Sequence, residues 1–223
     1  MLFRSPDGTR IYNKDGALPS GVSDEEYDAA ATILGQSWVG DLVFTLDQIE
    51  RLQTGEIISI FQGYLDTSRI GMLGHSTGGG AVLQTCWQDD RCQAVVGEDP
   101  WLVPYDRAMP ASELKLPSLN MFSENWLREP NLALNNQLWD NQPPGAQRMT
   151  IFGTQHYDFS DISLYSPLGS TLGLKGHNNA EREISLFNDF LIRFFDQHLV
   201  NPDSTLLDAA VEEYDEVEFE EKQ

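Results

Sequence analysis

The sequence is poor in basic residues: 14 lysines and arginines stand against 35 aspartates and glutamates, which gives a formal net charge of −21. Nucleic-acid phosphates and anionic membrane surfaces both bind through clustered lysines and arginines. The shortage of cations therefore argues against a nucleic-acid partner and against electrostatic docking on a membrane. It predicts an acidic, well-solvated surface instead.

Cysteine is also scarce, since Cys86 and Cys92 are the only two in the chain. Two cysteines are too few for a disulfide scaffold, and their spacing is not that of metal ligands. We therefore expect two unpaired and mostly buried thiols.

Long apolar segments are missing as well, because no uninterrupted run approaches the roughly 20 residues that span a bilayer. We therefore expect no stable membrane insertion. The N-terminal residues contain no apolar core of a signal peptide, which favours a cytoplasmic location.

The length of 223 residues suffices for one sizeable hydrophobic core. After a turn-rich lead-in over residues 1–22, a capping box at Ser23 to Glu26 opens a helix with an apolar stripe. We expect one domain over residues 1–202, followed by an acidic, disordered tail over residues 203–223.

Short apolar runs bounded by turns predict buried strands, and helical periodicity separates several of them. These runs are residues 70–73, 94–97, 119–122 and 149–152. Strands that alternate with helices predict an α/β fold with a mostly parallel sheet and helices on both faces. Residues 57–61 are ambiguous between another short strand and a buried loop.

The sequence Gly-His-Ser-Thr-Gly at residues 74–78 follows one of these strands and precedes a helix. A strand, a sharp turn and a helix in this order are typical of a nucleophile elbow, which makes Ser76 the candidate nucleophile. We expect that a Cβ atom at Gly74 or Gly78 would collide where strand and helix approach each other.

A serine nucleophile needs a base within hydrogen-bond reach and an acid that orients the base. Among the four histidines, His156 alone follows a buried strand, and it comes after Ser76 as the chain order of such hydrolases requires. Asp99 and Glu124 each close a strand between the two. The triad logic itself leaves both open as the acid.

The tetrahedral intermediate of acyl transfer needs hydrogen-bond donors for its oxyanion. The backbone N–H of Thr77, the residue after the nucleophile, is the expected first donor. A second donor usually comes from a glycine-rich loop after an earlier strand, and the sequence before Ser76 contains no such loop. Three tryptophans could line an acyl pocket, but the usual burial of this residue favours core positions for Trp101, Trp126 and Trp139.

Three segments resemble the platelet-activating factor acetylhydrolase family of α/β-hydrolases, in its bacterial, lipase-like branch. They are the elbow at residues 74–80, an acid segment at 98–104 and a base segment at 153–161. The resemblance implies an α/β-hydrolase fold, Ser76 as nucleophile, His156 as base, and Asp99 rather than Glu124 as acid.

The activity that the resemblance implies is hydrolysis of short or oxidised acyl groups from the sn-2 position of glycerophospholipids. The partner is then a small-molecule ester or a phospholipid, and no metal or other cofactor is needed. The resemblance also implies that the chain corresponds to the C-terminal two-thirds of the family fold. The strand beside the elbow and its oxyanion loop would precede residue 1.

Two alternatives stay open. The first is a catalytically weak or inactive hydrolase fragment that serves as an interaction module. The second is a general esterase or polyester hydrolase, because a fold does not specify a substrate.

Overall fold

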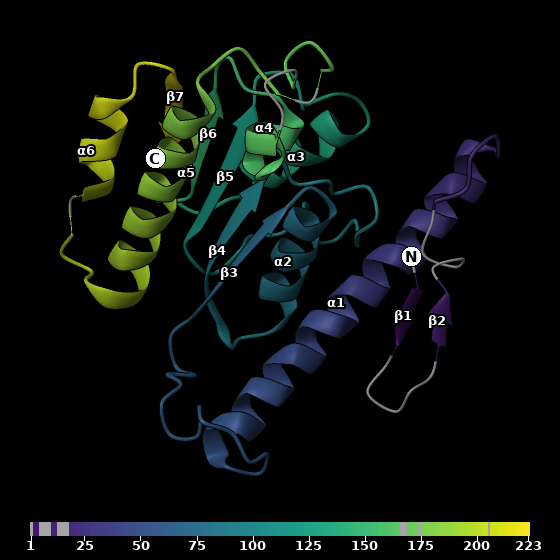
Figure 1. The fold of residues 1–223 in the computed structure, drawn as a ribbon, viewed down its shortest axis with the longest axis vertical. Coiled ribbons are helices and arrows are strands. Elements are labelled where there is room, and N and C mark those ends of the chain that lie inside the picture. The colour runs from purple at the N-terminus through teal and green to yellow at the C-terminus, as the bar shows by residue number, and fades with distance from the viewer. Residues whose placement is uncertain (1, 5–9, 13–17, 166–168, 174, 205) are drawn as a thin grey trace.

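The structure is a computed structural model that describes residues 2–4, 10–12, 18–165, 169–173, 175–204 and 206–223. Its centre is a five-stranded sheet in the order β3-β4-β5-β6-β7 (Figure 1). The strands are β3 (Ile70–His75), β4 (Cys92–Glu98), β5 (Ser118–Ser123), β6 (Gln147–Ile151) and β7 (Val217–Glu221). The first four are parallel, and β7 runs antiparallel to β6.

Helices cover both faces of the sheet, as the alternation of strands and helices predicted. The helices α1 (Asp24–Thr54) and α2 (Thr77–Gln88) lie on one face, and α5 (Ala180–Phe195) and α6 (Leu206–Glu213) lie on the other (Figure 1). Strand β4 supplies apolar side chains to both layers: Val95 belongs to the core beside α2, whereas Ala94 and Val96 belong to the core beside α5. The sheet is thus buried on both sides, as a parallel sheet requires.

Shorter elements complete the described chain. They are the antiparallel pair β1 (Leu2–Arg4) and β2 (Arg10–Tyr12), the helices α3 (Asn131–Asp140) and α4 (Ile162–Tyr165), a 3-10 turn η1 (His156–Phe159) and a π-helical turn η2 (Asp196–Val200).

Helix α1 begins at the predicted capping box, in which the Ser23 hydroxyl accepts from the Glu26 N–H and the Glu26 carboxylate accepts from the Ser23 N–H. It runs unbroken to Gly55. This helix is long and apolar enough to cross a membrane by length and composition alone, so the absence of stable membrane insertion stays a prediction. In the fold it packs against α2 through buried residues that include Val39 and Leu46.

Within residues 206–223 the acidic C-terminal segment forms α6 and β7, so the expected disordered tail over residues 203–223 is wrong. Leu207, Ala210 and Tyr214 of this segment are buried in the same core as α5. Glu218 and Glu220 of β7 alternate with Val217 and Phe219, so these two glutamates face outward while Val217 and Phe219 pack against the core. The high acidic content therefore reflects one solvated face of an amphipathic segment.

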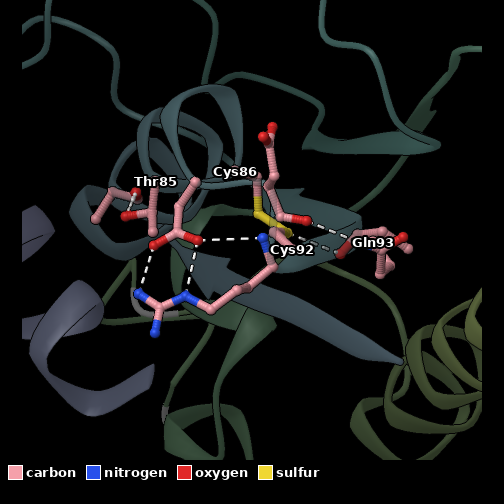
Figure 2. Close-up of a disulfide and its surroundings, with 9 residues drawn as sticks. Thr85, Cys86, Cys92 and Gln93 are labelled. Carbon is pink, nitrogen blue, oxygen red and sulfur yellow. Dashed lines mark hydrogen bonds and ion pairs between the residues drawn. A yellow bond between two sulfur atoms is a disulfide. The ribbon is translucent and has the colours of Figure 1, made fainter. Parts of the chain in front are cut away.

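The two cysteines form a disulfide between α2 and the start of β4, so the expected pair of free thiols is also wrong (Figure 2). The chain turns back at once after α2, which brings the Cα atoms of Cys86 and Cys92 to 5.1 Å from each other. Arg91 stabilises this turn through hydrogen bonds to the carboxylate of Asp89. The spacing of the cysteines did not reveal the turn, because disulfide geometry depends on the tertiary fold.

Glu183, in the first turn of α5, makes the stability of the protein sensitive to pH. The side chain is buried, and burial together with the negative charge of Asp158 raises the pKa of Glu183 from 4.5 to about 7. A carboxyl group with a raised native pKa stabilises the fold fully below its unfolded pKa, and this contribution is lost as the pH rises toward 7. Glu183→Gln should remove this decrease in stability with rising pH.

The free energy of unfolding from urea titrations would show this effect. Between about pH 5 and about pH 8, the wild type should lose roughly 2 kcal/mol more than Glu183→Gln. Glu181→Gln, at an exposed position of the same turn, serves as the control and should follow the wild type. Equal pH dependence of Glu183→Gln and the wild type would contradict the assignment.

Candidate active site

Ser76 lies at the junction of β3 and α2, and its backbone is held in a rare conformation with φ 58°. Both of its peptide groups are hydrogen-bonded to the end of β4 and the segment that follows it. The Ser76 N–H donates to the carbonyl of Glu98 at 2.8 Å, and the Ser76 carbonyl accepts from the N–H of Trp101 at 2.9 Å. Conformations of this kind persist only where the surroundings impose them, which is typical of a nucleophile elbow.

The glycines of the elbow permit this close approach, although not all in the predicted places. A Cβ atom at Gly74 would lie 2.3 Å from the carbonyl oxygen of Gly78, so the expected collision occurs there. At Gly78 the nearest atom, from Trp38, is 3.6 Å away, so the expectation for this position is wrong. Two other positions in the helix are crowded: a Cβ would lie 2.9 Å from the Gly74 carbonyl oxygen at Gly79 and 2.2 Å from the Trp101 carbonyl oxygen at Gly80.

The structure brings the predicted serine, aspartate and histidine together at the carboxyl ends of the strands. The Nε2 atom of His156 lies 3.0 Å from Ser76 Oγ, and its Nδ1 atom lies 3.0 Å from Asp99 Oδ2. Glu124, the alternative acid, is exposed and accepts instead from the backbone N–H of Gly153 at 2.9 Å. The geometry thus pairs Asp99, and not Glu124, with the imidazole.

Asp99 is fully buried and is oriented by a residue that the sequence analysis missed. The N–H of Ser123 donates to Asp99 Oδ1 at 2.8 Å, and the Ser123 hydroxyl donates to Asp99 Oδ2 at 2.6 Å. Burial raises the pKa of Asp99, and the hydrogen bonds from His156 and Ser123 oppose that rise by favouring the carboxylate. Ser123 ends β5, the strand that pairs with β4, and this position was the signal from which its contact with Asp99 could have been predicted.

Ser123→Ala is expected to lower kcat for ester hydrolysis about tenfold to a hundredfold, because a hydrogen bond to a charged group contributes about 1.5–3 kcal/mol. Kinetics with a p-nitrophenyl ester would measure the effect. Ser118→Ala is the matched control, since Ser118 is buried at the opposite end of β5 and its hydroxyl has no partner among the described residues. An equal decrease in both variants would show that the effect is structural.

Two other rings lie against the imidazole of His156. The indole of Trp126 stacks on it with ring centroids 3.7 Å apart and 6° between the planes, and the His75 ring lies at 4.4 Å. Burial and the neighbouring His156 lower the pKa of His75 to about 4. The remaining histidines, His177 and His198, lie elsewhere: His177 follows the base segment in an exposed loop, and His198 is in η2.

A cavity of about 910 Å³ opens beside the nucleophile. Trp101 and Trp126 line it together with Ser76 and Thr77, the first residue of α2. The expectation that these two tryptophans are core residues is therefore wrong. Trp139 is elsewhere, under the guanidinium of Arg148.

A second cavity of about 490 Å³ adjoins His156 and shares Trp101 and Trp126 with the first. Among the described residues, one group of three could hold a metal ion: the ligating atoms of His75, Asp99 and His156 all lie within 4.8 Å of one another. These residues include the base and acid of the candidate triad, so a metal here would compete with the proton transfers that a triad performs.

Comparisons with known proteins place this site in context. Platelet-activating factor acetylhydrolase from Gallus gallus is 28% identical over 137 residues, which make up 60% of this chain and 32% of that protein. The Canis lupus familiaris protein of the same name is 29% identical over 156 residues, 68% of this chain and 34% of its own. The chain thus spans about a third of the length of these curated relatives.

A solved structure, the ferulic acid esterase from Streptomyces cinnamoneus, superposes with a TM-score of 0.73. The match covers 98% of this chain and 62% of that one at 22% identity, and it shows the α/β-hydrolase fold. The family model described as platelet-activating factor acetylhydrolase, isoform II, matches residues 28–217, a range that contains the elbow, Asp99 and His156. The chain therefore belongs to the platelet-activating factor acetylhydrolase isoform II family.

Proposed function

We propose that the protein is a serine carboxylic-ester hydrolase that uses Ser76, His156 and Asp99 as a catalytic triad. The observation that carries the proposal is the continuous series of hydrogen bonds, 3.0 Å each, from Ser76 Oγ through both ring nitrogens of His156 to Asp99. Membership of the family and the α/β-hydrolase fold support the same activity.

In this mechanism His156 Nε2 accepts the hydroxyl proton as Ser76 Oγ attacks the ester carbonyl carbon. The backbone N–H of Thr77 donates to the oxyanion of the tetrahedral intermediate. His156 then gives the proton to the leaving alcohol, and an acyl-enzyme remains on Ser76. Water, deprotonated by His156, releases the acid and restores the serine.

Asp99 fixes the tautomer of His156 in which Nδ1 carries the proton, and its negative charge stabilises the imidazolium that forms at each transfer. The carboxylate is suited to this role because Ser123 donates a hydrogen bond to each of its oxygens and the side chain is fully buried.

For the substrate, we propose short acyl esters, including those at the sn-2 position of glycerophospholipids. The names of the curated relatives support this class. The cavity beside Ser76 supports it too, since tryptophan side chains form apolar walls for an acyl group.

A fluorophosphonate probe, which reacts with activated serines, tests the function directly. The probe should label the purified protein once, and mass spectrometry should place the label on the peptide that contains Ser76. Hydrolysis of p-nitrophenyl acetate should stop in parallel with labelling. Rapid hydrolysis without a label on Ser76 would refute the assignment.

A panel of esters separates the substrate classes. An sn-2 acetyl phosphatidylcholine, a long-chain phosphatidylcholine, a feruloyl ester and a polyester would be compared at equal concentration. Preference for the short sn-2 ester supports the phospholipid assignment, and preference for the polyester or the feruloyl ester supports a general esterase. Failure of all substrates, with no labelling, would favour the inactive interaction module.

A further inference from the structure

His75 is a potential metal ligand that the proposed mechanism does not use. It is the last residue of β3, directly before the nucleophile. Its Nε2 atom is buried and has no hydrogen-bond partner among the described residues. A buried nitrogen without a partner is unfavourable, because it has given up its hydrogen bonds to water. A ligand that supplied a bond to this atom would therefore be favoured.

His75 and two neighbouring side chains offer the kinds of ligand atom that zinc prefers. The ligating atoms of His75, His156 and Asp99 lie within 4.8 Å of one another. Two histidines and one carboxylate are a common set for zinc with a fourth position open to solvent or substrate. Asp99 is already oriented by two hydrogen bonds from Ser123, as ligating carboxylates usually are.

The distances require only a small rearrangement for a zinc ion to fit. Ligand atoms around tetrahedral zinc lie about 3.4 Å apart, given metal–ligand distances near 2.0–2.1 Å. Asp99 Oδ2 and His156 Nδ1 are 3.0 Å apart and would need to separate slightly. The ligating atoms lie within 4.8 Å of one another, so the widest pair would have to approach by up to about 1.4 Å, through changes in histidine χ angles.

We propose that Zn²⁺ binds to His75, His156 and Asp99 and inhibits the esterase reversibly. The ion replaces the proton shared by His156 Nδ1 and Asp99, and this proton leaves to solvent. His156 then no longer cycles between imidazole and imidazolium, so Ser76 loses its base. The ion enters from the cavity of about 490 Å³, which His156 and Ser123 line. The inhibition rests on the proposed function, whereas the binding does not.

Inhibition is measured by titrating ZnCl₂ into the p-nitrophenyl acetate assay in a buffer without chelator. Zinc should abolish turnover, and EDTA should restore it. His75→Phe keeps a flat ring without nitrogen atoms and should raise the zinc concentration for half-inhibition at least about tenfold, relative to its own uninhibited rate. His177→Phe, which alters an exposed histidine outside the cluster, should respond to zinc like the wild type.

Equal inhibition of the wild type and His75→Phe would overturn the proposal, as would equal inhibition by Mg²⁺ or Ca²⁺, which prefer oxygen ligands. If His75→Phe does not fold, as judged by circular dichroism, His75→Leu takes its place in the same comparison.

Equilibrium dialysis provides a readout without catalysis. Ser76→Ala retains the three ligands and should bind one zinc ion per chain, and Ser76→Ala combined with His75→Phe should not bind at the same concentration. Binding by both proteins would overturn the proposed site. If the wild type proved inactive but zinc binding depended on His75, the proposed function would fail while the metal site would hold.

Discussion

Ser76→Ala is expected to lower kcat for ester hydrolysis about a millionfold, the loss seen when the nucleophile of a serine hydrolase triad is removed. The size of the effect follows from the chemistry, because no acyl-enzyme can form without Ser76 Oγ. His156 would remain, but it would have only water to activate. The residual rate should come from the oxyanion donor and substrate binding alone.

The measurement is turnover of p-nitrophenyl acetate, together with fluorophosphonate labelling of the same samples. Ser37→Ala is the control, since Ser37 is exposed on α1 and its hydroxyl bonds only to a carbonyl of its own helix. This control should retain full activity. A loss of less than about tenfold in Ser76→Ala would exclude Ser76 as the nucleophile, because even a single oxyanion donor contributes more than that.

Asp99→Asn is expected to lower kcat about ten-thousandfold while leaving the fold intact. An asparagine amide group has nearly the shape of the carboxylate, but it cannot stabilise the imidazolium and favours the wrong tautomer of His156. The hydroxyl and N–H of Ser123, which both donate to Asp99, would also compete for the one amide oxygen.

Glu124→Gln is the matched control for the acid, because Glu124 is the other carboxylate that the sequence offered for this role. It contacts the backbone of Gly153 and not His156, so its loss should change kcat less than about tenfold. A larger decrease for Glu124→Gln than for Asp99→Asn would reverse the assignment of the acid. The thermal unfolding midpoint of each variant would separate lost chemistry from lost structure.

The three triad residues could be predicted from the sequence because the topology of the sheet alone brings them together. Ser76, Asp99 and His156 each follow a different parallel strand, and the carboxyl ends of parallel strands meet at one edge of the sheet. Local patterns of apolar residues placed the strands. The distances of 3.0 Å then follow from the fold, without further information from the sequence.

The partners of the triad were harder to predict because they depend on side-chain directions across the fold. Ser123 is one of many serines, and only the pairing of β4 with β5 brings it to Asp99. Tryptophan is usually a core residue, yet the loop after β5 places the Trp126 indole against the ring face of His156. Residues 57–61 were expected to form a strand or a buried loop, and they form a turn in which Ile58 and Ile60 are exposed.

The C-terminal segment shows a different limit of sequence analysis. Composition alone predicted disorder, because nine of its 21 residues are Asp or Glu within a chain of net charge −21. The segment is ordered instead because β7 pairs with β6, and Arg148 of β6 forms an ion pair with Glu220 of β7. Long-range pairing of this kind is not encoded in any local window of residues.

The position of β3 at the margin of the sheet has a consequence for the stiffness of the elbow. Strand β3 is bonded to β4 on one side, and no strand of the described chain occupies its other side. Alternate amide groups of β3 therefore point away from any strand, and their hydrogens should exchange with deuterium sooner than those of β4. Strand hydrogen bonds therefore hold the nucleophile in place only on the side of β4. A ligand that bound along the unpaired edge of β3 would reduce the fluctuations of Ser76.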